Sequence, residues 1–116
     1  METESGGEMT DKELLELAAK AAGIDLKMTT EKYKDGSVCY AWNPLTNDGD
    51  ALRLAVTLNL SMDLFEDVIL VGLVANNNDA EQLSEDTFPD PYAATRRAIV
   101  RAAAEIGKST TLKAAR

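Results

Sequence analysis

The sequence contains no histidine and only one cysteine. Catalytic triads, general bases and zinc sites that depend on an imidazole ring are therefore excluded. Cys39 has no second cysteine in the chain to pair with, so an intrachain disulfide is excluded as well. No histidine is present to deprotonate its thiol. We expect Cys39 to be a small packed residue in a protein of the reducing cytoplasm.

Long apolar runs and basic charge are also scarce. No apolar run approaches the ~20 residues that a membrane-spanning helix needs, so we predict no membrane association. The chain has 12 basic and 20 acidic residues, a net charge of -8. This balance argues against general nucleic-acid binding, because phosphate neutralisation needs clustered lysine and arginine. The basic residues gather in the last quarter of the chain, where they form either a binding surface or a solvated helix face beside acidic loops.

A chain of 116 residues predicts a single domain. We assign residues 1–9 to a disordered acidic tail, residues 10–107 to the domain and residues 108–116 to a basic C-terminal tail. The domain is long enough to bury one core without disulfides or metals.

Helices are predicted at both ends of the domain. Thr10 and Glu13 have the spacing of a capping box, which predicts a helix from residue 10 to residue 22. Asp90 and Pro91 predict the start of a second helix, and Gly107 its end. The buried side of this last helix is predicted to contain Tyr92, Ile99, Val100, Ala103 and Ile106.

Four strands are predicted, at residues 27–34, 38–42, 60–66 and 68–75. The first two join at Asp35-Gly36, a strong signal for a two-residue hairpin turn, because both turn positions need positive φ. The last two join at a tight turn at Glu66-Asp67, or residues 61–75 form a single long bent strand. The apolar run of residues 68–75 predicts a central strand covered on both faces, with Gly72 marking a bulge or a close contact. Residues 76–90 are polar and acidic and are predicted to form a long loop.

Residues 43–56 connect the second strand to a central helix. Pro44 ends the strand, Asn47 is the predicted N-cap, and Asp50 can reach back as its acidic partner. Arg53 lies three residues after Asp50, and the rest of the helix is largely apolar, so we predict that it is mostly buried. The order α-β-β-α-β-β-α favours an α+β protein: a three-layer α/β/α sandwich with a mostly antiparallel sheet of about four strands.

Two blocks of sequence together resemble the phage ABA-sandwich domain family. The first is WNPLT at residues 42–46, with Asp48 and then DALRLAV at residues 50–56. The second is DPYAATRRAIVRAAAEIG at residues 90–107. The resemblance implies a three-layer sandwich, a phage or prophage origin and the cytoplasm of a bacterial host. It implies no biochemical activity and supplies no catalytic residues.

Two groups of residues are candidate sites. The first comprises Tyr40, Trp42, Asn43, Asp48, Asp50 and Arg53. An aromatic ring beside a buried arginine and a helix N-terminus can hold a nucleotide-like anion. In the alternative, Trp42 is core and Arg53 pairs with Asp50. The second group, Arg96, Arg97 and Arg101, is either an interaction surface for a partner protein or a solvated helix face.

No cofactor or metal is expected. Gly107-Lys108-Ser109-Thr110 resembles the end of a phosphate-binding loop, but Ala102 occupies the position of its first glycine and the segment follows a helix. Asn47, Asp48 and Asp50 are spaced like the start of a calcium loop without its final bidentate acid. Our first hypothesis is a non-catalytic phage accessory protein that binds a host or phage protein, or forms a homo-oligomer. The alternative is a small-ligand binder or minor enzyme at the first site.

Overall fold

The computed structural model describes residues 9–26, 30–32, 34–36, 38–74 and 80–114, and it is an α+β protein. Its helices are α1 (Asp11–Ala22), α2 (Asp48–Thr57) and α3 (Pro91–Ala114). Its strands are β2 (Thr30–Lys32), β3 (Val38–Tyr40), β4 (Ser61–Leu64), β5 (Val68–Val74) and β6 (Ala80–Asp86). Among the described residues the order is therefore α-β-β-α-β-β-β-α, one strand more than predicted.

Local capping signals are confirmed at the helix starts. The Thr10 hydroxyl accepts a hydrogen bond from the Glu13 backbone N–H, and the Glu13 carboxylate accepts one from the Thr10 N–H. The backbone N–H of Thr10, and also its hydroxyl, donate to the Glu13 carboxylate, and these two bonds hold the pKa of Glu13 below its ordinary value. The Asn47 side chain caps α2, and Asp90 caps α3 just before Pro91. Each helix therefore begins where its own polar side chain satisfies free backbone N–H groups.

Strands β4, β5 and β6 form an antiparallel sheet with β5 in the centre. The predicted hairpin at Glu66-Asp67 is confirmed, because the Phe65 N–H donates to the Val68 carbonyl at 3.0 Å. The inner face of β5 carries Ile69, Val71 and Leu73, all buried. This face holds the centre of the hydrophobic core.

Strand β6 lies inside residues 76–90, which were predicted to be a loop. Its residues are mostly acidic or small, and only Leu83 is a large apolar side chain. Intrinsic preference does not favour a strand there. Seven residue pairs nevertheless join β6 to β5, because a central apolar strand needs backbone partners on both sides. The loop prediction was wrong because the residues of β6 do not themselves indicate a strand. The indication comes from β5, which needs a backbone partner on that side.

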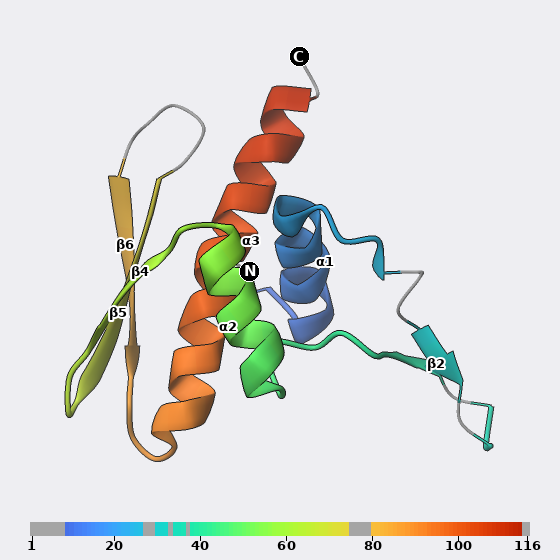
Figure 1. Cartoon of the computed structure of the whole chain (residues 1–116), viewed down its shortest axis with the longest axis horizontal. Helices are drawn as coiled ribbons and strands as arrows, with labels where there is room; N and C mark the ends of the chain where they lie inside the picture. The colour runs from blue at the N-terminus through green and yellow to red at the C-terminus, as the bar shows by residue number, and fades with distance from the viewer. Residues whose placement is uncertain (1–8, 27–29, 33, 37, 75–79, 115–116) are drawn as a thin grey trace, which may run out of the picture.

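Strands β2 and β3 form a separate antiparallel ribbon, which Figure 1 places apart from the main sheet. The predicted turn at Asp35-Gly36 lies between them, and Gly36 has a φ of +92°. Among the described residues, the predicted single sheet of about four strands is thus replaced by three strands and a ribbon of two. A hairpin signal is local and does not determine where the hairpin docks.

Helix α3 is the centre of the fold. It contacts β5 and β6 on one side and α1 and α2 on others, and Figure 1 shows the helices on one side of the three-stranded sheet. The other face of β5 presents Val68, Leu70 and Gly72, all of intermediate exposure. The second helical layer of the predicted sandwich is absent from the described residues. An antiparallel sheet can leave one face to water, so the apolar run of β5 did not require two covers.

Two glycines mark close approaches. A Cβ on Gly72 would collide with the Ser61 hydroxyl across the β4–β5 pair, and the register continues through it, so it marks a contact and not a bulge. A Cβ on Gly107 would collide with the Leu17 carbonyl of α1. Gly107 therefore does not end the helix, as predicted, and α3 continues to Ala114. We call the contact of α1 with α3, which includes Leu14, Leu17, Ala18 and Gly107, the α1–α3 seam.

Candidate functional site

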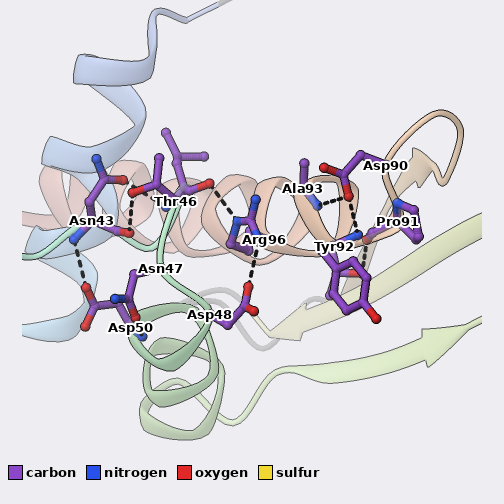
Figure 2. A network of polar contacts seen from close by, with 12 residues as sticks. Asn43, Thr46, Asn47, Asp48, Asp50, Asp90, Pro91, Tyr92, Ala93 and Arg96 are labelled. Carbon is purple, nitrogen blue, oxygen red and sulfur yellow. Dashed lines mark hydrogen bonds and ion pairs between the residues drawn. The ribbon is translucent and has the colours of Figure 1, made fainter.

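Arg96 joins the start of α3 to the loop before α2. Its Nε donates to the Leu45 carbonyl at 2.8 Å, and one terminal nitrogen donates to an Asp48 carboxylate oxygen at 2.7 Å. Its side chain is 18% exposed, whereas that of Asp48 is 72% exposed. Figure 2 shows the bond between Arg96 and Asp48. The structure thus brings together one residue from each predicted site, across 48 positions of sequence.

The loop before α2 is held by its own polar groups. The Asn43 N–H donates to the Asp50 carboxylate at 3.0 Å, and the Asn43 side chain accepts from the Leu45 N–H at 3.0 Å. The Asp50 N–H donates to the Asn47 side chain at 2.9 Å. Asp50 therefore reaches back past the cap to Asn43, four residues further than the predicted capping box. These bonds give the loop one fixed shape (Figure 2).

The aromatic part of the predicted ligand site is arranged differently from expectation. Trp42 is partly buried and packs against the core. The Arg53 side chain is 74% exposed, not buried, and it bonds the Asp50 carboxylate at 2.9 Å. Tyr40 lies on β3, and its side chain is outside what the structure describes. Asp50 thus already neutralises the arginine that an anion would need.

The other two arginines of α3 bind neighbouring elements. Arg97 pairs with Asp11 at the start of α1 at 3.2 Å. Arg101 pairs with Glu85 of β6 and donates to the Ser84 carbonyl at 3.0 Å. Both border a depression of about 380 Å³ between α1, β6 and α3. Each of these cations has an acidic partner within the chain, so this face offers a partner little unpaired charge.

A second depression, of about 390 Å³, is mostly apolar. It lies between α2, β4 and the start of α3, and we call it the α2–β4 groove. Its lining comprises Asp48, Leu52, Met62, Leu64, Phe65, Ile69, Thr87, Pro91, Tyr92, Thr95, Arg96 and Ile99. Neither Trp42 nor Arg53 lines it. The lining of this groove is more apolar than that of the depression beside Arg97 and Arg101.

Four large side chains of this groove are more than half exposed. The exposed fractions are 56% for Leu52, 63% for Leu64, 54% for Phe65 and 70% for Tyr92. Tyr92 was predicted to be in the core, and α2 was predicted to be mostly buried. Both predictions were wrong because α2 packs mainly against α3, which covers one side of it, and the first turn of α3 leaves Tyr92 uncovered. The available signal was the apolar surface of α2, which is more than one neighbouring helix can cover.

The base of the groove is fixed by Thr87. It is buried, its hydroxyl donates to the Glu66 carbonyl at 2.6 Å, and its N–H donates to the Asp67 carbonyl at 3.3 Å. These bonds join the connection between β6 and α3 to the tip of the β4–β5 hairpin. With Arg96 holding the opposite wall, the groove is formed before any ligand arrives.

The walls of the groove suit binding by apolar contact. Its charged groups, Arg96 and Asp48, pair with each other. Among the described residues, no cluster of three or more potential ligands could hold a metal ion. None of the described helices has the length and apolar character needed to cross a membrane. In comparisons with known proteins, the chain matches no family model, no curated protein and no solved structure.

Proposed function

We propose that this protein is a non-catalytic interaction module that binds apolar side chains of a partner protein in the α2–β4 groove. The observation that carries the proposal is the gathering of Leu52, Leu64, Phe65 and Tyr92, each more than half exposed, around one depression. Single exposed apolar residues are ordinary on protein surfaces, whereas a contiguous group marks an interaction site.

The energetics favour this use of the groove. Each apolar side chain gains about 25 cal/mol for every Å² that a partner removes from water. The groove volume of about 390 Å³ is in the usual range for concave binding sites. Because Arg96 and Thr87 already fix its walls, little ordering cost opposes binding. Aromatic residues such as Phe65 and Tyr92 are enriched among the dominant contacts of interfaces.

The resemblance to the phage ABA-sandwich family supports a setting for this module. We propose a phage or prophage accessory protein that acts in the bacterial cytoplasm on a host or phage protein. No observation favours the second function, a nucleotide-like anion site at Trp42 and Arg53. Arg53 already forms a salt bridge with Asp50, and Trp42 packs against the core.

The test is selection of binding peptides from a random display library on the immobilised protein. We expect selected peptides to lose at least tenfold in affinity for Leu64→Ser and to bind Val74→Ser as they bind the unchanged protein. Val74 is a matched control, because it is a strand residue that is 60% exposed and lies outside the groove lining. Peptides that bind both variants equally would refute the proposal, as would a selection that enriches none.

A further inference from the structure

One side of β4 has unpaired backbone groups. The Phe65 N–H donates to the Val68 carbonyl, so this pair of the hairpin is hydrogen-bonded. Bonded and non-bonded pairs alternate along an antiparallel ladder. Ser61 and Asp63 therefore bond to β5, whereas Met62 and Leu64 direct their N–H and C=O groups away from it. Among the described strands, none pairs on that side. We call it the β4 edge.

The same two residues line the α2–β4 groove. Met62 and Leu64 pair with Val71 and Ile69, which lie on the buried inner face of β5, so their side chains share that face. The backbone groups of the β4 edge and the apolar side chains of the groove are therefore adjacent. A strand laid along β4 would reach both at once, because every second side chain of a strand points to one face.

Acidic residues occupy the remaining positions near this edge. Asp63 alternates with Met62 and Leu64 and lies on the outer face of the sheet, where it is exposed. Glu66 and Asp67 form the exposed hairpin tip that follows. The described charges of the groove itself cancel, since Arg96 pairs with Asp48. The outer side of a strand added here therefore faces net negative charge, which favours a cation.

The other edge of the sheet is partly covered by α3. By the same alternation, Ser84 directs its carbonyl away from β5, and Arg101 donates to that carbonyl. Arg101 also pairs with Glu85 beside it. Arg101 of α3 therefore covers part of this edge, and the charged side chains that β6 itself carries discourage foreign pairing. The two edges therefore differ: among the described residues, the β4 edge combines unpaired backbone groups with apolar surface, and the β6 edge does not.

We propose that the β4 edge accepts an extended segment of a partner protein as a fourth strand of the sheet. The segment alternates apolar side chains, which enter the α2–β4 groove, with lysine or arginine, which face Asp63 and the hairpin tip. This inference rests on the proposed function and specifies its partner. The backbone bonds to Met62 and Leu64 supply affinity, and the alternating pattern supplies specificity.

Charge argues against two other occupants. A second copy of β4 would bring its own Asp63, Glu66 and Asp67 to the same edge, and each chain carries a net charge of -8. Residues 1–8 of this chain contain three glutamates and no basic residue. Neither a second copy of β4 nor residues 1–8 supplies the lysine or arginine that Asp63 and the hairpin tip favour. Like charges placed together also disfavour association.

The test uses a synthetic peptide of about seven residues, the usual length of a strand, in which valine or leucine alternates with lysine. Three controls share its length: a blocked-order peptide of the same composition, a peptide with glutamate in place of lysine, and an N-methylated form that cannot donate from one side of its backbone. Binding is measured by calorimetry at two salt concentrations, and the contact by amide NMR shifts of the protein.

We expect the alternating peptide to bind at least tenfold more tightly than all three controls and to shift the amides of Met62 and Leu64. Asp63→Lys should reverse the preference between the lysine and glutamate peptides, while Asp86→Lys, on the other edge strand, should preserve it. Equal binding of the blocked-order peptide would overturn the proposal, because it would show attraction by net charge alone.

Two further outcomes would overturn strand addition in different ways. Library peptides that bind the groove as helices, without shifting the Met62 amide, would refute it and leave the interaction module standing. Concentration-dependent dimers of the protein alone, with the same amides protected, would show that a second copy occupies the β4 edge. Loss of all groove binding would refute the proposed function as well.

Discussion

Helix α3 contacts its neighbours in two contrasting ways. At the α1–α3 seam the backbones approach so closely that Gly107 has no room for a Cβ beside the Leu17 carbonyl. At the α2–β4 groove the same helix leaves Tyr92 70% exposed beside other apolar side chains. Close packing gives stability, whereas an unfilled apolar surface gives a place to bind. One helix therefore contributes stability near Gly107 and a binding surface near Tyr92, at its opposite ends.

The largest effect is expected at the seam from Gly107→Val. A side chain there must push α1 away from α3, so we expect the free energy of unfolding to fall by more than about 3 kcal/mol. Chemical denaturation measures this loss. Lys108→Val is the control, because it introduces the same side chain one position later on an exposed face and should cost under about 1 kcal/mol. Equal losses would show that the seam is not close-packed at Gly107.

The same substitution in both regions compares them directly. Leu14 is 4% exposed in the seam and Leu64 is 63% exposed in the groove. Leu14→Ala should lower the free energy of unfolding by about 2–3 kcal/mol, because it removes buried surface and leaves a cavity. Leu64→Ala should change it by less than about 0.5 kcal/mol. Thermal unfolding of the two variants under the same conditions measures this difference. A large loss of stability for Leu64→Ala would contradict the prediction, because it would show that Leu64 belongs to the core.

The smallest effect concerns the arginines. Arg96→Ala removes a bond to the Leu45 carbonyl from a side chain that is 18% exposed, so we expect a loss of about 2 kcal/mol. Arg97→Ala breaks a pair whose members are 41% and 67% exposed, and it should cost about 0.5 kcal/mol. Urea titrations of both variants measure the difference. If the two substitutions lower the free energy of unfolding equally, the Arg96 contact does not hold the groove wall more strongly than the Arg97–Asp11 pair holds α1.

Signals that act within a few residues predicted the fold best. The N-caps at Thr10, Asn47 and Asp90 and the turn at Glu66-Asp67 needed only neighbouring residues, and all are confirmed. The hairpin at Asp35-Gly36 is present, but its turn is not the predicted two-residue one, because five residues separate Lys32 from Val38 and only Gly36 of the predicted pair has a positive φ. The central strand β5 followed from its apolar run. What failed depends on contacts distant in sequence: the pairing of β6, the position of the ribbon and the helical layer expected on the outer face of the sheet.

The candidate site followed the same division. Asp48 and Arg96 were each singled out, but their contact joins residues far apart in the chain, so their pairing could not be predicted. Tyr92 was assigned to the core because apolar side chains usually are. Periodicity identifies the apolar side of an element, not whether another element covers it. The groove therefore depends on how the elements are placed in three dimensions, which the periodicity of each element alone does not determine.

Thr87 has a consequence for motion. Its two bonds attach the tip of the β4–β5 hairpin to the segment that leads into α3, so neither can open without breaking contacts to the other. We therefore expect the hairpin tip and the first turn of α3 to unfold locally as one unit. The amide hydrogens on these two sides of the groove would then exchange with solvent together, in events that leave the α1–α3 seam closed.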